Sequence, residues 1–538
     1  ELANLFNVER LAILKDINNI CNDKYHTDIT FQNIVQSGLD DPKVYQLLQK
    51  GYTQNIFQFS SKGMTKFLVS MQPDKIEDLI AANALFRPAT LDSGSTDKYV
   101  DCKLGDADPV YLWGTYNAMK NTYGVLCYQE QLAQIAREVG KFSLGEGVKL
   151  VKLISKKKVD KILALRDKFM AGANENGCPK EDAEAIWHMF EVAGGYLFNK
   201  SHATAYAVTA YAGAYLKANY PTAFYTIALQ WAKDDEIPTL MSEMELCSEA
   251  KIVPPDINVS GGTFITDYET NKIFWSLSRI KMLGAKATEW IINERNVRGE
   301  FSSIENFIER IFRYKLKLYK YWDDPDNPNE ATKCPVNARH VRHLILSGCF
   351  DKVENAQSVI ERYAILEKAA KCLGFEISEK DIPEDLRNKH YFWSQQQIAI
   401  SGIGAIDYKR IYDNSEAKPQ IKGKASWALL KNIQDPDYDG KRVAICANIV
   451  DIEEKKFKDK KTGENRVFCK LLLQQNNDLV EMVIWNDEWM NVRATLCKGG
   501  SLSSAKNKML ICSAQVKYSD YTGGNNLQLY KSSIIDIL

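Results

Sequence analysis

Apolar residues recur every three or four positions through much of the first 255 residues of the chain. This spacing places apolar side chains on one face of a helix. The clearest helical segments are 129–140, 148–166, 183–193 and 203–219. A Pro-Pro pair in KIVPPDINVS (251–260) interrupts the pattern, and weak alternation over 261–275 predicts a short hairpin. Further on, the pattern predicts helix–turn–helix in 278–310 and another helix in 336–351.

The last hundred residues change from helical to strand-like patterning. Five short runs are typical of strands: RVAICANIVDI, RVFCKLLLQ, LVEMVIW, KMLICSAQVKY and NLQLYKSSIIDI. One helical segment, DEWMNVRATLC (487–497), falls between the third and fourth runs. Five strands with one intervening helix predict a small barrel of the oligonucleotide-binding (OB) type, although another five-stranded barrel would have a similar pattern. The expected fold class is multidomain: mainly α-helical regions followed by a C-terminal five-stranded OB-type β-barrel.

Length and composition narrow the class of protein. A chain of 538 residues is too long for one core and is expected to form about three or four domains. The 69 Lys and Arg balance 69 Asp and Glu, so any nucleic-acid-binding surface has to be local. The 12 cysteines form no C-x-x-C pair, which favours free thiols in a reducing compartment. No apolar run approaches the ~18 residues of a membrane span. No signal peptide is visible, and because residue 1 is Glu, a fragment or processed product is expected.

The segment LFNKSHATAYAVTAYAGAYLKANYP (197–221) combines polar donors with a long helical pattern. Ser201 is a suitable N-cap, flanked by Lys200 and His202. The free N–H groups of a helix N-terminus favour phosphate. Four alanines fall on one face that would pack closely on a neighbour: Ala203, Ala207, Ala210 and Ala214. The residues alone leave two interpretations open, a phosphate site or a small-residue packing helix with an incidental cap.

A second candidate is the basic stretch KLVKLISKKKVDK (149–161), which holds six lysines and one aspartate. Lys149, Lys152 and Lys156 share one face of a helix at i, i+3 and i+7. Such a helix suits phosphates or a nucleic-acid backbone, and a solvated surface helix is the alternative.

Five motifs stand in a fixed order: NIFQFSSKGM (55–64), IEDLIAANALFRPATLDSG (76–94), YGVLCYQEQLAQIAREVGKFSLGEGVKLVKLISKKK (123–158), GGYLFNKSHATAYAVTAYAGAYLKANYPTAF (194–224) and PPDIN (254–258). With these motifs the chain resembles the C-family replicative DNA polymerases of bacteria and phages, the family of the DNA polymerase III alpha subunit. The resemblance implies the C-terminal portion of such a protein, from the palm edge and fingers through a helix–hairpin–helix region to the OB domain. The implied domains are 1–50 (palm edge or connecting segment), 51–260 (fingers, dNTP-binding), 261–370 (helix–hairpin–helix, duplex-DNA-binding), 371–440 (linker region) and 441–538 (OB fold).

The resemblance also implies site residues. Those expected to contact the incoming dNTP are Arg87, Lys152, Lys156, Lys157, Tyr196, Asn199, Lys200, Ser201, His202 and Tyr206. Those expected to contact DNA are Lys281, Gly284, Lys286, Trp485, Tyr518 and Tyr521. For the barrel aromatics, and for the nearby Trp489, core or loop packing is the alternative to base stacking.

The implied activity is part of a replicative DNA-directed DNA polymerase, a nucleotidyltransferase that binds primer–template DNA and an incoming dNTP. The reaction uses two Mg²⁺ ions held by carboxylates. In this family the paired palm aspartates precede the fingers, so we expect them on a missing segment or a separate polymerase subunit. Asn4, in NLFNVERL (4–11), stands where the family has a third catalytic aspartate, and an amide is a poor ligand for Mg²⁺. No metal ligand is therefore predicted in this chain.

An alternative function follows from Asn4: a catalytically inactive, polymerase-derived DNA-binding protein that acts as a replisome scaffold. The sequence also departs from the family where Val151 and Lys152 replace a pair of arginines. Lys152 keeps a charge but lacks the bidentate fork of arginine. A sliding clamp is a further candidate partner, no membrane partner is expected, and the expected location is the cytoplasm of a bacterium or of a virus-infected host.

Overall fold

The structure is a computed structural model, and it divides into two compact units, Glu1–Phe224 and Tyr225–Leu538. The structure describes residues 8–537, with gaps. The gaps are residues 28, 156–158, 313–333, 405, 407, 414, 416, 422–424, 459–464, 477, 498–499, 507, 520–523 and 530–535. The division falls inside helix α15 (Pro221–Trp231).

The described part of the first unit is built from helices. In chain order they are α2 (Val8–Tyr25), α3 (Phe31–Gln36), α4 (Pro42–Gln49), α5 (Lys62–Met71), α6 (Ile76–Leu85), α7 (Pro88–Asp92), α8 (Ser95–Leu104), α9 (Tyr116–Met119), η1 (Lys120–Thr122), α10 (Gln129–Glu138), α11 (Leu144–Ser155), α12 (Val159–Glu175), α13 (Lys180–Ala193) and α14 (Lys200–Asn219).

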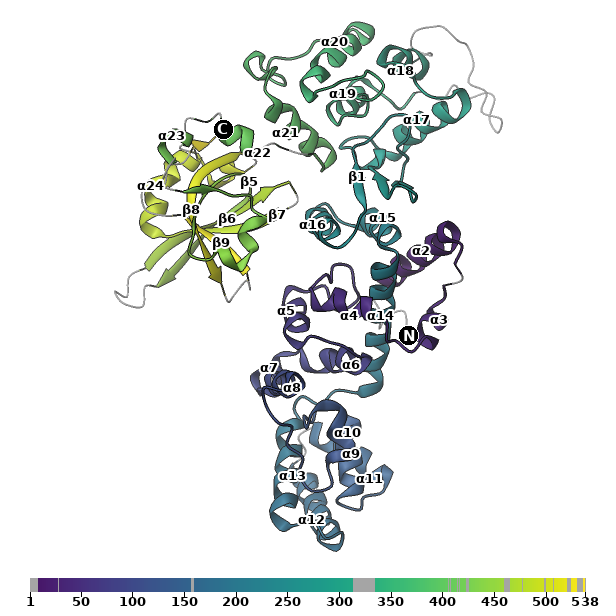
Figure 1. Ribbon diagram of the computed structural model, residues 1–538, viewed down its shortest axis with the longest axis vertical. Helices are drawn as coiled ribbons and strands as arrows, with labels where there is room; N and C mark the ends of the chain where they lie inside the picture. The colour runs from purple at the N-terminus through teal and green to yellow at the C-terminus, as the bar shows by residue number, and fades with distance from the viewer. Residues whose placement is uncertain are drawn as a thin grey trace. The chain divides into compact units, whose positions relative to one another are not determined.

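Helix α14 is the long central element of this unit. It packs along α4 and α6, and α10–α13 gather beyond its N-terminal end (Figure 1). The predicted alanine face is confirmed as a packing face, since all four alanines are completely buried: Ala203, Ala207, Ala210 and Ala214. Helix α6 contributes the buried residues Ala81, Ala82 and Ala84. Small side chains on both helices allow the two backbones to approach closely and hold α14 firmly.

The α10–α13 group has its own apolar core around Phe169, Trp187 and Phe190. The helical pattern over 148–166 corresponds to two helices, because α11 ends at Ser155 and α12 begins at Val159. Residues 156–158 between them lie outside the described residues. Glu146, in the first turn of α11, forms an ion pair with Lys168 of α12 and so links the two helices.

The described part of the second unit contains a three-stranded sheet, a seven-stranded sheet and further helices. Before the barrel its elements are α16 (Ile237–Cys247), β1 (Lys251–Val253), β2 (Ile265–Asp267), β3 (Lys272–Phe274), η2 (Leu277–Arg279), α17 (Ala285–Arg298), α18 (Ile304–Ile311), α19 (Ala338–Leu346), η3 (Val359–Glu361), α20 (Arg362–Leu373), η4 (Glu384–Leu386), α21 (His390–Ser401), α22 (Tyr408–Asp413) and α23 (Ala417–Ile421).

The predicted hairpin is confirmed by antiparallel pairing of β2 with β3. A third strand, β1, pairs in parallel with β3 and was not predicted, because three residues are too few to show a period. The predicted helix–turn–helix corresponds to α17 and α18, which pack with α19–α21 around Phe307, Ile345 and Trp393.

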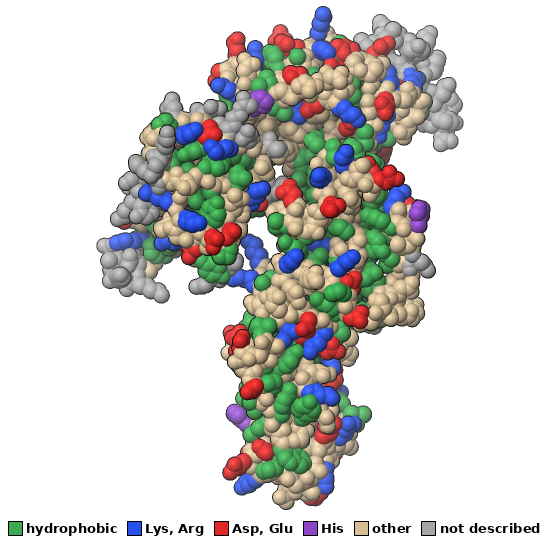
Figure 2. Space-filling view, viewed as in Figure 1, with side chains coloured by type: hydrophobic (Ala, Val, Ile, Leu, Met, Phe, Trp, Pro, Cys, Tyr) green, Lys and Arg blue, Asp and Glu red, His purple; other side chains and the backbone are tan. Residues whose placement is uncertain are grey.

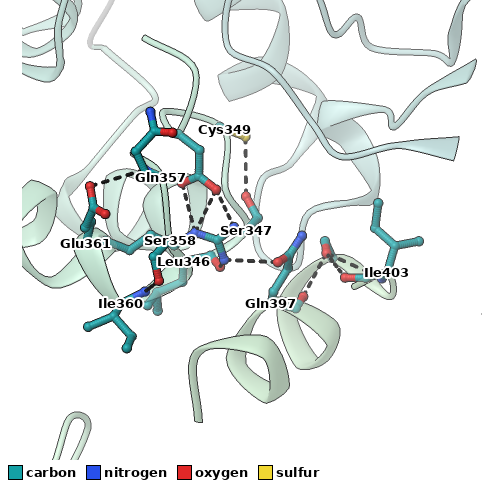
Figure 3. A network of polar contacts seen from close by, with 12 residues as sticks. Leu346, Ser347, Cys349, Gln357, Ser358, Ile360, Glu361, Gln397 and Ile403 are labelled. Atoms are coloured by element: carbon teal, nitrogen blue, oxygen red, sulfur yellow. Dashed lines mark hydrogen bonds and ion pairs between the residues drawn. The ribbon is translucent and has the colours of Figure 1, made fainter. Parts of the chain in front are cut away.

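Arg362, at the start of α20, is a buried charge that links this helix to α19 and α21. Its partners Leu346 and Gln397 are labelled in Figure 3. Its guanidinium donates from Nε to Asp351 at 2.9 Å, and from Nη1 to the Leu346 carbonyl at 3.1 Å and to Gln397 at 3.0 Å. Gln397 belongs to α21, within the range expected to be a linker, 371–440. That range therefore includes a helix tied into the core, while the domain boundaries themselves stay predictions.

The C-terminal barrel confirms the expected fold class. Its elements are β4 (Ser426–Trp427), η5 (Asn432–Gln434), η6 (Pro436–Tyr438), β5 (Arg442–Lys458), β6 (Asn465–Gln475), β7 (Asp478–Ile484), α24 (Asn486–Cys497), η7 (Leu502–Ala505), β8 (Met509–Ser519), β9 (Gly524–Leu529) and β10 (Asp536–Ile537). The strand order β8-β9-β7-β6-β5 closes through pairing of β5 with β8, with α24 between β7 and β8. Five strands closed in this order with one helix form an OB-type barrel.

The distribution of charged side chains and the state of the cysteines agree with the sequence analysis. Lys and Arg side chains are mixed with Asp and Glu over the face shown in Figure 2. All 12 cysteines are free. No helix among the described residues is long and apolar enough to cross a lipid bilayer.

Candidate functional site

Two helix N-termini, those of α10 and α14, are joined in the first unit. Tyr128, which directly precedes α10, and Phe198, two residues before α14, form a parallel β-bridge. In it the Phe198 N–H donates to the Cys127 carbonyl at 2.9 Å, and the Gln129 N–H donates to the Phe198 carbonyl at 2.9 Å. The bridge brings the YQEQ and FNKSH motifs, which are far apart in the sequence, to one place.

Asn199 is the N-cap of α14. Its backbone is extended (φ −73°, ψ 120°), and its side-chain oxygen accepts the His202 N–H at 2.8 Å. Ser201 lies in the first turn with an exposed side chain. The prediction that Ser201 is the N-cap is wrong, because the chain is already helical at Lys200 and Asn199 occupies the capping position.

A carboxylate lies at the mouth of α14. One oxygen of Glu130 accepts from the Asn199 side-chain amide at 3.0 Å, and the other accepts the Lys200 N–H at 2.9 Å. Glu130 comes from the first turn of α10. A negative group at a helix N-terminus is favourable because it meets the free N–H groups there. Sequence reasoning missed Glu130, although its place in YQEQ was visible.

Arg87 and Tyr196 meet beside this mouth. The Arg87 guanidinium donates to the Tyr196 carbonyl and, from Nε, to the Ala84 carbonyl at 2.9 Å. It also stacks over the Phe198 ring, 4.5 Å from its centroid. Burial lowers the pKa of Arg87, but an arginine remains protonated at neutral pH. The Tyr196 hydroxyl accepts from Ser95 at 3.2 Å.

A row of rings continues along α14 from Phe198, through the partly buried His202 and Tyr206, to the buried Phe57. The His202 ring lies 5.5 Å from Phe198 and 4.2 Å from Tyr206, and Tyr206 lies 5.0 Å from Phe57. Lys200 lies over the Tyr128 ring at 5.6 Å. The structure thus brings together six of the predicted nucleotide-binding residues: Arg87, Tyr196, Asn199, Lys200, His202 and Tyr206.

The predicted lysines of the basic stretch are only partly described. Lys152 is exposed on α11, and Lys156 and Lys157 lie outside the described residues. The buried side of α11 packs closely on the segment that leads to α14. Ile154 lies so near Gly194 that a Cβ there would be 1.9 Å from its side chain. Position 194, the first glycine of the GGY motif, therefore has no room for a side chain.

The described residues do not fit a two-metal site. They contain no group of three or more His, Cys, Asp or Glu side chains arranged to hold a metal ion. Asn4 lies outside them. We therefore derive no reaction step through Mg²⁺ from these residues.

Comparisons with known proteins identify the family of this chain. Residues 10–177 match the family model described as the bacterial DNA polymerase III alpha subunit finger domain, and residues 249–320 match a helix–hairpin–helix motif. The DNA polymerase III subunit alpha of Aquifex aeolicus (strain VF5) is 34% identical over 365 residues, 67% of this chain and 29% of the relative. That of Escherichia coli (strain K12) is 28% identical over 522 residues, 93% of this chain and 42% of the relative. The chain belongs to the DNA polymerase III alpha-subunit family.

The chain spans less than half the length of these alpha subunits, 29% and 42% of the two relatives. That of Thermus aquaticus is 36% identical over 285 residues, 51% of this chain and 23% of the relative. The finger-domain match covers α2–α12 except the first two residues of α2, and the helix–hairpin–helix match covers η2, α17 and α18.

The hairpin of the helix–hairpin–helix motif joins η2 to α17. Gly284 is the N-cap residue of α17, and Lys281 and Lys286 are exposed on either side of it. The Lys281 N–H donates to the Ile400 carbonyl at 2.8 Å, and the Lys281 carbonyl lies 2.5 Å from Nδ1 of His343. Burial lowers the pKa of His343. The backbone contacts hold the hairpin on α19 and α21 and leave both lysine side chains in solvent.

The barrel aromatics separate into core and surface. Trp489 is completely buried, and its Nε1 donates to Glu454 at 2.7 Å, so it is a core residue. Trp485 is 44% exposed and Tyr518 57% exposed. Tyr521 lies outside the described residues. Trp485 is close to Phe457 and Phe468, which the sequence patterns did not single out.

Proposed function

We propose that this chain forms the nucleotide- and DNA-binding part of a replicative DNA-directed DNA polymerase. Its membership of the alpha-subunit family supports the class of activity. The observation that carries the proposal is the junction of α10 and α14, where Arg87, Asn199 and Lys200 surround one helix N-terminus. This is the arrangement expected of a triphosphate site, with N–H groups and cations converging on one place.

The proposed role of these residues is electrostatic. Lys200 and Lys152, together with Lys156 and Lys157, would neutralise the triphosphate, since cations preorganised around a phosphoryl group stabilise its developing charge. Arg87 donates hydrogen bonds to two backbone carbonyls, and it would therefore also hold the segment around Tyr196 in place. His202 and Tyr206 would present flat rings beside the sugar or base, and Ser201 a hydroxyl.

The metal-binding carboxylates of the reaction would come from outside the described residues. Two Mg²⁺ ions supply a Lewis acid and an activated primer hydroxyl in polymerases of this chemistry. We propose that a palm segment, on a further part of the polypeptide or on a separate subunit, holds them. The residues described here would bind and orient the nucleotide and the DNA.

DNA would be bound at two places in the second unit. The exposed lysines of the hairpin, Lys281 and Lys286, with Gly284 between them, would contact duplex phosphates. The barrel, with Trp485, Tyr518 and Tyr521, would contact the single-stranded template. A sliding clamp stays a proposed further partner.

Primer extension with the polymerase that contains this chain tests the proposal. Lys200→Ala should raise the KM for dNTP about tenfold or more, because a charge-assisted contact to phosphate is lost. The matched control is Lys180→Ala, an exposed lysine in the first turn of α13. Equal dNTP kinetics in both variants would exclude the role of Lys200. Complete absence of extension with every palm-bearing partner, with DNA binding retained, would favour the replisome scaffold suggested by Asn4.

A further inference from the structure

A cavity of about 730 Å³ lies where the hairpin of the second unit contacts α19 and α21. Its walls are Lys281 and Met282 of the hairpin, side chains of α19 and α21, and the segment that follows α20. Both wall helices pack around the core that contains Ile345 and Trp393. The cavity is therefore bounded mainly by packed helices.

Apolar side chains form the inner part of the cavity. Leu346 and Ile400 line it and are almost completely buried, and Phe375 is half-buried. Ala399, on α21, lines it with an exposed side chain. An apolar group that covers these side chains would gain free energy because it would remove them from water.

Met282 adds an exposed apolar side chain to the edge of the cavity. It is 53% exposed, and its φ of 73° lies in the left-handed region, which is uncommon for a residue with a side chain. The preceding residue is fixed on both sides, since the Lys281 N–H donates to the Ile400 carbonyl at 2.8 Å and the Lys281 carbonyl lies 2.5 Å from Nδ1 of His343. The packed helices thus hold the turn in a conformation that costs free energy, as is common at binding sites.

The charged side chains around the cavity are mostly cations. Lys281, Arg339, Arg342 and Lys380 line it together with one acid, Asp381. Arg342 donates to Asp381 at 2.6 Å. The other three cations are exposed and form no ion pair with a described residue. The lining therefore has a net positive charge in a chain whose own net charge is zero.

We infer that this cavity binds an acidic peptide segment of a partner protein, with an apolar side chain of the peptide on the inner wall and carboxylates beside the cations. Clusters of arginine and lysine recognise acidic motifs in this way. Duplex DNA could place phosphates near the same cations, but its polar outer surface would leave the apolar wall uncovered. A free phosphate would use the cations alone. The inference goes beyond the proposed function, because it concerns a protein partner rather than DNA or dNTP.

Fluorescence anisotropy of the full chain with a labelled peptide tests the inference. The probe carries glutamates on both sides of one phenylalanine, and two matched probes exchange the phenylalanine for serine or every glutamate for lysine. The first probe should bind at micromolar concentration. The serine probe should bind about tenfold more weakly because it buries no apolar side chain. The lysine probe should not bind measurably, because its charge is repelled.

Variants of the cavity separate the two kinds of contact. Arg339→Glu and Lys380→Glu should each weaken binding of the first probe about fivefold, because repulsion replaces attraction. Ala399→Trp should weaken it about tenfold by filling the apolar part of the cavity while every cation remains. The control is Lys389→Glu, an exposed lysine directly before α21 that does not line the cavity, and it should keep the affinity. Thermal unfolding of each variant distinguishes lost binding from lost folding.

Three results would overturn the inference. The first is the absence of saturable binding of the acidic phenylalanine probe. The second is displacement of that probe by inorganic triphosphate as effectively as by unlabelled peptide, which would mean a simple anion site. The third is an equal loss of affinity for duplex DNA in Arg339→Glu and Ala399→Trp, which would assign the cavity to DNA. Because peptide binding needs neither dNTP nor catalysis, it can succeed even where the polymerase proposal fails.

Discussion

Glu130 has two opposing effects at the N-terminus of α14. Its carboxylate accepts from the Lys200 N–H and the Asn199 amide, and so holds the FNKSH segment in place. The same carboxylate is a negative charge at the position proposed for a triphosphate. A charge at a helix end contributes about 0.3–1 kcal/mol at an exposed site. At the residue scale, the Glu130 carboxylate therefore orders the N-cap of α14 and also repels the proposed triphosphate ligand.

Replacing Glu130 by Gln should separate these two effects. The amide oxygen can still accept the Lys200 N–H, but the charge is lost, so the KM for dNTP should fall about two- to fivefold. Primer extension at varied dNTP measures this change. Glu138→Gln, which alters another carboxylate of α10, is the control and should leave KM unchanged. A higher KM in Glu130→Gln would mean that ordering of the cap outweighs repulsion.

Arg362 shows the cost of a buried charge. Its side chain is enclosed, whereas its partner Asp351 keeps 30% exposure. Replacing Arg362 by Met would leave Asp351 and Gln397 without their donor and should lower the free energy of unfolding by about 3 kcal/mol. Urea denaturation measures the loss. The exposed Arg339 provides the control, since Arg339→Met should change stability by less than about 0.5 kcal/mol.

Some helices in the first unit are also connected through their ends. The β-bridge joins the starts of α10 and α14, and Glu146 joins the start of α11 to α12. Glu146 also accepts the Ser143 N–H at 3.1 Å. At the element scale, the ion pair with Lys168 therefore helps to set how α12 lies against the helix that carries Lys152.

The pKa of Glu146 tests this link. The hydrogen bond from Lys168, with that from Ser143, lowers it from 4.5 to about 2. Because the pKa is depressed in the folded chain, the stabilisation is present above about 4.5 and is lost as the pH falls towards 2. In Lys168→Ala the midpoint should move back up towards 4.5. Titration of the Glu146 carboxyl by NMR measures it, and an unmoved midpoint would mean that Lys168 does not set it.

Across the whole molecule, 69 cations balance 69 anions. Because its net charge is zero, the chain as a whole does not attract DNA. Binding therefore has to come from a few local contacts with phosphates, each of which releases counterions from the DNA. The hairpin lysines of the second unit, Lys281 and Lys286, are two such contacts in our proposal.

Salt dependence counts these contacts. In the double variant Lys281→Ala, Lys286→Ala the slope of log K against log salt for duplex DNA should become less negative by about 1.8, or 0.9 for each lost phosphate contact. Fluorescence anisotropy over a salt series measures the slope. The control exchanges two exposed lysines of the first unit, Lys98 and Lys180, and should keep the original slope. A slope that is equal in both double variants would remove the hairpin from the DNA interface.

Periodicity in the sequence was sufficient for the kind and order of elements. Alternation and turn residues predicted the five barrel strands with α24 between them, and the spacing of Ala203, Ala207, Ala210 and Ala214 predicted the packing face of α14. Both are local patterns, since the side chains of a helix or strand face inward at fixed intervals whatever their neighbour is. The motifs likewise indicated the family from the residues alone.

Only the tertiary structure decided which residues meet. Glu130 reaches the cap of α14 because a β-bridge joins two distant segments, and Phe457, Phe468 and Trp485 touch because the register of three strands aligns them. The N-cap of α14 is Asn199 rather than the predicted Ser201, because the helix begins two residues earlier than the sequence pattern indicated. Local patterns determine which face of an element is buried, but pairing between distant segments determines its neighbours, and the proposed sites are made of such neighbours.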